Sequence, residues 1–213
     1  MPANSLRALA ALLSVVTLGA APRPPVVAIA TSLGTIDVRL DTVHAPRTTA
    51  NFLHYVDEER LDDTDFFRAA RATGAPSQGF IEGGIGTDAR RTLASVPLEP
   101  TDRTGIRHTD ATLSMARNPD PNSATGNFSI TVGPAPGLDA RPGAPGYAAF
   151  GHVLSGMDVV RRILAGATFP GGEGAFKGQM LVHRVKIISV RRIDGVPTSR
   201  PPAFKPWALG VRR

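Results

Sequence analysis

The side chain with the most unusual surroundings in the sequence is Arg68. It lies in the short apolar run Asp65 to Ala70, with two phenylalanines before it and two alanines after it. An arginine in such a run is either an edge residue that extends its charge into solvent or a charge held in a pocket. Further along the chain, Gly83 and Gly84 end a second apolar run, and paired glycines there indicate a bulge or a close approach of two backbones.

A second candidate for a site is the stretch Thr112 to Val132. Its ends, Leu113 to Ala116 and Asn127 to Val132, have the composition of β-strands, and the residues between them are turn formers. Two short strands joined by a polar loop are typical of one wall of a binding site. Other elements of the chain must complete that wall.

Several kinds of chemistry find no support in the sequence. The five histidines, His44, His54, His108, His152 and His183, show no metal-binding spacing, and the chain has no cysteine. No glycine-rich nucleotide motif occurs, and neither GxSxG nor SxxK is present for an activated serine. We therefore expect no metal and no cofactor.

The first 21 residues have the pattern of a secretory signal peptide. Arg7 supplies one positive charge, Ala8 to Val16 is apolar, and small residues at Gly19 to Ala21 suit cleavage after Ala21. The apolar run is too short for a transmembrane helix, so we expect a periplasmic protein without stable membrane insertion. The alternative is an N-terminal helix that stays in the mature protein.

The charge of the chain bears on its partners. The formal net charge is +6, and the excess is arginine in pairs spread along the sequence. Nucleic-acid binding favours basic residues interleaved with aromatics, which make up only 6% of this chain, so no nucleic-acid partner is expected. A weak attraction to anionic membranes or acidic partners is the simpler interpretation.

Hydrophobic spacing predicts about eight short strands and two helices. Pro46 opens an amphipathic helix of about three turns. A second helix is expected to begin at Ser155 as N-cap, with Asp158 as its capping partner. Arg71 to Gln78 is predicted to be a loop, and residues 85 to 111 are predicted to be mostly polar connection.

The two helices are expected near either end of the chain, not in alternation with the strands. This order favours a mainly β fold, a closed eight-stranded antiparallel β-barrel capped by two α-helices, over residues 22–194. Residues 195–213 are rich in proline and are predicted to be a C-terminal tail.

Six short motifs follow one another between about Val26 and Val190. They are Phe66-Phe67-Arg68, Phe80 to Gly84, Leu113 to Arg117, Ser123 to Ile130, Leu138-Asp139, and Tyr147 to Val153 with Gly156 to Val160. In this order they resemble the cyclophilin-type peptidyl-prolyl cis-trans isomerases, and bacterial periplasmic members most closely. The resemblance also implies the barrel with two helices, with proline bound in a groove on its outside.

The resemblance implies a catalytic role for Arg68. Rotation about a peptide bond is opposed by about 18 to 20 kcal/mol because the C–N bond has double-bond character. A guanidinium that donates to the prolyl nitrogen favours the twisted state, without a covalent intermediate, metal or cofactor. The implied partners are proline-containing unfolded polypeptides, bound by a monomer. The implied substrate-binding residues are Phe80, Glu82, Met115, Ala116, Arg117, Asn127, Phe128, Ser129, Leu138 and Tyr147.

The sequence departs from the family pattern at the proline pocket. Glu82 replaces a glutamine and is placed to pair with Arg68, which would orient the arginine or compete with substrate. Ser129 and Gly137 replace aromatic residues, Gly79 alters the frame before Glu82, and Phe80 is placed to fill part of the gap. Loss of an aromatic wall costs on the order of 1 to 3 kcal/mol of binding, so we expect a slow or selective isomerase.

Two other functions remain open. The first is a cyclophilin-fold module that binds proline-containing segments with little or no catalysis. The second is a structural envelope protein that uses its basic surface and its proline-rich tail. Phe80 separates the first alternative from the enzyme: a ring over the groove favours a rebuilt pocket, and a ring in the core favours the binding module.

Overall fold

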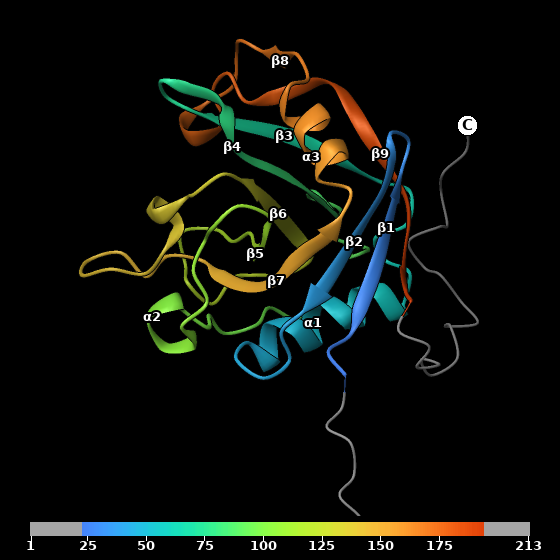
Figure 1. Cartoon of the computed structure of the whole chain (residues 1–213), viewed down its shortest axis with the longest axis vertical. Coiled ribbons are helices and arrows are strands. Elements are labelled where there is room, and N and C mark those ends of the chain that lie inside the picture. Colours follow the sequence, from blue (N-terminus) through green and yellow to red (C-terminus); the bar gives the residue numbers. More distant parts are fainter. Residues whose placement is uncertain (1–22, 194–213) are drawn as a thin grey trace, which may run out of the picture.

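The computed structural model describes residues 23–193, and within them the chain forms a closed β-barrel (Figure 1). Its barrel strands run in the order β1, β2, β7, β5, β6, β4, β3, β9, and β9 returns to pair with β1, with every pair antiparallel. Their bounds are β1 Val26–Thr31, β2 Gly34–Leu40, β3 Thr64–Ala72, β4 Ala75–Gly84, β5 Thr112–Met115, β6 Asn127–Val132, β7 Ala148–Ser155 and β9 Met180–Arg192. The predicted eight-stranded barrel is confirmed.

Three α-helices and some short elements accompany the barrel in residues 23–193. These are α1 Pro46–Asp57, α2 Thr101–Thr104, α3 Met157–Leu164, the two-residue strand β8 Thr168–Phe169 beside β9, and the 3-10 turns η1 Pro136–Leu138 and η2 Gly174–Phe176. Helices α1 and α3 lie at opposite ends of the barrel (Figure 1). Helix α2 was not predicted, because its four residues are too short to show a helical period.

The core fills the barrel interior and joins it to α1. Phe52 of α1 packs against Phe128 of β6 with ring centroids 5.4 Å apart, and Phe66 of β3 packs against Phe128 at 5.7 Å. All three rings are at most 1% exposed. Because side chains alternate along a strand, the neighbours of Phe66 and Phe128 on the other face point out of the barrel.

Two local predictions were wrong. Residues Arg71 to Gln78 are not a loop, because β3 continues to Ala72, β4 starts at Ala75, and Arg71 pairs with Gly79. Ser155 does not cap α3. It lies at the end of β7, where its hydroxyl donates to Asp37 Oδ2 at 2.7 Å, and Gly156 takes the N-cap position with φ +88°.

Phe128, whose ring packs against both Phe52 and Phe66, gives a test of the core packing. Phe128→Ala should lower the free energy of unfolding by about 3 to 5 kcal/mol, because it leaves a cavity between two other rings. Urea denaturation measures this. Leu154→Ala is the matched control, since that side chain is 48% exposed, and it should cost far less. Equal losses for the two variants would contradict the packing described.

Candidate functional site

An open groove of about 690 Å³ runs over the outer face of the barrel. Its wall and floor come from β3, β4, the ends of β5 and β6, and the segment that leads into β9. It is lined by Phe67, Glu82, Gly86, Thr87, Ala89, Thr92, Ala116, Arg117, Asn118, Ser123, Thr125, Asn127, Phe176, Met180 and Arg184. Four of the predicted substrate-binding residues are among these: Glu82, Ala116, Arg117 and Asn127.

Strand register places a polar row beside this groove. Arg68 of β3 is opposite Glu82 of β4, Glu82 is opposite Ser129 of β6, and Ser129 is opposite Ser114 of β5. Opposite residues in antiparallel strands have Cβ atoms about 4.5 to 5.5 Å apart, so the row is continuous over four strands. The pairing of β3 with β4 shifts between Phe66 and Arg68. This bulge lies directly beside Arg68.

The Arg68 guanidinium is held from several sides. Its side chain is only 12% exposed and forms an ion pair with Glu82, from Nη1 to Oε2 at 2.8 Å. Nε and Nη2 both donate to Gln179 Oε1, at 2.9 and 2.7 Å, and Nη2 also donates to the Ala175 carbonyl at 2.9 Å. Of the five N–H groups of an arginine, only the second one on Nη1 lacks a partner among residues 23–193.

Two phenylalanine rings pack against the same guanidinium. Its Cζ atom lies 5.0 Å from the centre of the Phe80 ring and 4.6 Å from that of Phe176. Phe80 is half-buried and lies outside the hydrophobic core, whereas the next residue, Ile81, is fully buried in it. The ring of Phe80 therefore lies on the Arg68 side of the sheet and not in the core, although Phe80 is not among the residues that line the groove.

The far side of the groove is held by a second arginine. Arg117 donates from Nε and Nη2 to the Gly146 carbonyl at 3.0 and 2.8 Å, and its guanidinium lies 4.7 Å from the centre of the Tyr147 ring. Tyr147 in turn donates its backbone N–H to the Leu138 carbonyl at 2.9 Å. Arg117, Leu138 and Tyr147 thus form one unit that fixes the loop after η1 to the end of β5.

Other predicted contacts need correction. Phe128 and Met115 are 0% and 1% exposed and belong to the core, so their side chains cannot reach a peptide outside the barrel. The Asn127 amide is used internally, with Oδ1 accepting from the Gly86 N–H at 2.8 Å and Nδ2 donating to the Gly86 carbonyl at 2.9 Å. Ser129 is 7% exposed, and its strand alternates with core residues, so it faces outward in the polar row.

The polar row continues from buried Ser114 to buried His108 and half-buried Asp139, three residues that were not predicted to lie together. His108 Nδ1 lies 2.8 Å from Asp139 Oδ1, and His108 Nε2 lies 2.8 Å from the Ser114 hydroxyl. Burial lowers the pKa of His108, although the hydrogen bond with Asp139 acts in the opposite direction. Burial opposes ionisation of Asp139, but hydrogen bonds from His108 outweigh it and lower the pKa of Asp139. Neutral His108 therefore donates to the carboxylate and accepts from Ser114.

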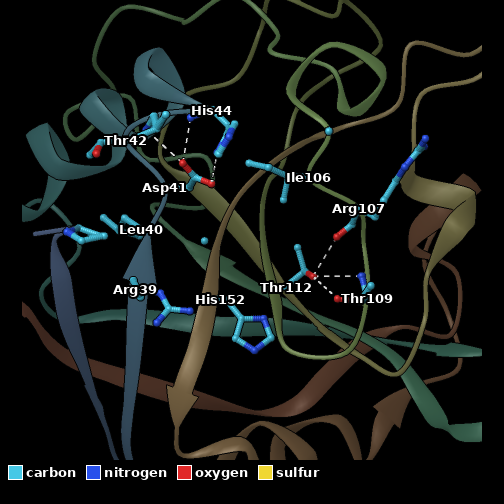
Figure 2. A pocket seen from close by; sticks show the side chains of 14 residues that line it. Arg39, Leu40, Asp41, Thr42, His44, Ile106, Arg107, Thr109, Thr112 and His152 are labelled. Carbon is cyan, nitrogen blue, oxygen red and sulfur yellow. Dashed lines mark hydrogen bonds and ion pairs between the residues drawn. The ribbon is translucent and has the colours of Figure 1, made fainter.

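A second cavity, of about 540 Å³, lies elsewhere on the barrel, between the ends of β2 and β7 and the segment before β5 (Figure 2). Arg39 and His152 are paired across the strands there, Asp41 holds His44 at 2.8 Å, and Arg107 comes from the facing segment. None of the predicted site residues lines this cavity. The groove beside Arg68 is therefore the candidate site.

The composition of the described part of the chain bears on metal ions and membranes. Residues 23–193 contain no group of three or more His, Cys, Asp or Glu side chains placed to hold a metal ion. In the same residues, none of the helices has the length and apolar character needed to cross a membrane. The predicted signal peptide and C-terminal tail lie outside the described residues.

The closed barrel with a groove on its outer face is the fold of one family of prolyl isomerases. Residues 26–192 match the family model of cyclophilin type peptidyl-prolyl cis-trans isomerases, and the chain belongs to this family. Among similar proteins, a peptidyl-prolyl cis-trans isomerase of Acinetobacter baylyi is 34% identical over 170 residues, covering 80% of this chain and 86% of that protein. Peptidyl-prolyl cis-trans isomerase A of Dickeya dadantii is 34% identical over 75% of this chain and 84% of its own.

A solved structure agrees in fold. A cyclophilin type isomerase of Cryptosporidium parvum, crystallised in the presence of the dipeptide Ala-Pro, aligns with a TM-score of 0.62 over 78% of this chain and 98% of its own. Its sequence is 18% identical, so this likeness concerns the fold. The predicted family is confirmed, while the roles of the individual site residues remain predictions.

The buried histidine predicts a pH dependence of stability. Its pKa is lowered in the folded state, so the unfolded chain binds more protons as the pH falls below the ordinary histidine value of about 6.5. The free energy of unfolding should therefore fall as the pH is lowered through that range. Replacement by a non-titrating residue, His108→Gln, should flatten this slope in urea titrations, and the exposed control His183→Gln should not. An unchanged slope in His108→Gln would refute the assignment.

Proposed function

We propose that this chain catalyses cis-trans isomerisation of prolyl bonds in polypeptides that lie in the groove beside Arg68. The observation that carries the proposal is the remaining Nη1 N–H of a guanidinium otherwise fixed by Glu82, Gln179 and the Ala175 carbonyl. A fixed donor with one open N–H can form its last hydrogen bond without reorganisation. Such a donor stabilises the transition state more than the ground state.

The chemistry needs little more than this donor. In the planar amide the prolyl nitrogen shares its lone pair with the carbonyl and is a poor acceptor. In the twisted state that lone pair is localised on nitrogen, and an N–H from Arg68 can bond to it. Apolar side chains that line the groove, such as Phe67 and Met180, offer a surface for the proline ring. The Ala-Pro dipeptide used with the Cryptosporidium parvum protein is the class of substrate that we propose here.

Binding without turnover is the second candidate function. It is favoured by the small side chain of Ser129, which leaves less apolar surface for the proline ring, and by the extent to which Arg68 is already bonded. An exchange assay by NMR on an Ala-Pro peptide separates the two functions. Catalysed exchange supports the enzyme, whereas peptide binding without exchange above background supports the binding module.

Removal of the guanidinium tests the proposed role directly. Arg68→Ala combined with Glu82→Gln, which avoids an unpaired buried carboxylate, should lower kcat/KM by about 10²- to 10³-fold, the usual effect of losing one transition-state donor. A protease-coupled assay on an Ala-Pro peptide measures the rate. Glu82→Gln alone and the exposed-site variant Arg162→Ala are the controls. A double variant as active as Glu82→Gln would exclude Arg68.

We also propose that the protein acts on exported chains in the periplasm. The signal-like pattern of residues 1–21 supports this proposal. Uncatalysed prolyl isomerisation takes tens of seconds or more, which is slow enough to limit folding after export. A catalyst in that compartment would shorten this step.

Processing of the N-terminus tests the location. When the full chain is expressed in a Gram-negative host, the periplasmic fraction should contain a protein whose sequence starts at Pro22, by N-terminal sequencing and intact mass. A variant that lacks residues 2–21 should remain in the cytoplasm. Recovery of the full chain in the cytoplasm with residues 1–21 attached would contradict the proposal.

A further inference from the structure

The segment Gly171 to Gln179 contributes three residues that contact Arg68 and belongs to none of the motifs that identify the family. It joins β8 to β9 and passes through the 3-10 turn η2. The Gly178 N–H donates to the Gly171 carbonyl at 2.9 Å and closes the segment on itself. Gly172, with φ +99°, allows the turn that brings residues 175 to 179 back to the sheet. The segment is therefore a folded wall of the groove.

Gln179 is attached to β3 at two points. Its backbone carbonyl accepts the N–H of Ala69 at 2.8 Å, and its side-chain Oε1 accepts both Nε and Nη2 of Arg68. Because the backbone of Gln179 is fixed beside the arginine, its side chain holds the edge of the guanidinium formed by Nε and Nη2. Glu82 holds Nη1. The remaining Nη1 N–H can point in few directions.

Phe176 presents a large apolar surface where the barrel itself offers little. Its ring lies 4.6 Å from the Arg68 guanidinium and lines the groove together with Phe67 and Met180, yet it is 45% exposed. In the polar row beside the groove, the outward position of β6 is Ser129, which has no ring. A phenylalanine half open to solvent next to a charged donor, in a groove, is placed to contact an apolar ligand group.

We propose that Phe176 is a specificity-determining residue that packs on the substrate proline, and that Gln179 is a positioning residue for Arg68. This inference rests on the proposed isomerase function and refines it. The ring that the pocket lacks at position 129 is supplied from the segment before β9, and the glutamine absent at position 82 is replaced by Gln179. The site is thus assembled from a different part of the chain.

The role of Phe176 is tested by a cycle of variants with Ser129. Phe176→Ala should raise KM for an Ala-Pro peptide by roughly ten- to a hundredfold with kcat little changed, and raise the peptide Kd in an NMR titration to match. Phe176→Leu should recover part of the loss. Ser129→Phe should restore binding in Phe176→Ala more than it improves the unmodified protein, because the two rings would fill one site. Lys177→Ala, an exposed neighbour, should change neither constant.

The role of Gln179 requires a separate readout. Gln179→Leu keeps the side-chain volume but removes the acceptor, and it should lower kcat by at least about tenfold with KM unchanged. Gln179→Glu keeps an acceptor oxygen and should recover most of kcat. Gln179→Leu should also cost some free energy of unfolding, because it leaves an Arg68 N–H without its acceptor. Urea denaturation should nevertheless show both variants fully folded under the assay conditions, which separates the loss of kcat from unfolding.

Opposite results would overturn the inference. If Phe176→Ala raised kcat/KM, the segment would be a cover that substrate must displace. If Gln179→Leu kept full kcat, or if the Phe176 and Ser129 effects simply added, the segment would not form the site. If the unmodified protein binds the peptide without catalysis, the isomerase proposal fails, yet the Kd values still decide the role of Phe176.

Discussion

The candidate site depends on one constraint, the need to satisfy a guanidinium that is almost covered on the outside of a barrel. A charge removed from water is tolerated only when it is paired and its N–H groups have acceptors. Glu82 supplies the opposite charge and one acceptor. Gln179 and the Ala175 carbonyl supply the other acceptors, and two phenyl rings pack against the guanidinium. The β3 bulge, the start of β9 and the turn η2 all meet at this residue, and the contacts from these elements hold the Arg68 guanidinium in place.

The elements that the sequence could predict are those specified by local patterns. Alternating apolar residues indicated short strands, Pro46 marked the start of α1, and the family motifs placed Glu82 to pair with Arg68. The same alternation places Phe128 in the core and Ser129 outside, so the misassignment of Phe128 came from the family motif and not from the strand pattern.

The contacts that could not be predicted are those between residues far apart in the chain. Gln179 lies 111 residues from Arg68, in a glycine-rich segment without a hydrophobic period. Ser155 has the right residue type for a helix cap, but Asp37, 118 residues away, binds its hydroxyl instead. His108, Ser114 and Asp139 are likewise brought together only when β5 and the loop after η1 pack on each other. In each case the contact depends on tertiary structure and not on the local sequence.

The pairing of β9 with β1 has a consequence for how the protein folds. Val27 pairs with Arg192, so the first and last strands of the described chain form the seam of the barrel. Without β9, β1 and β3 would both be left as open sheet edges, and Gln179 would not reach Arg68. Contacts of such long sequence separation form late and slowly. The barrel therefore cannot close until the polypeptide has been synthesised through β9.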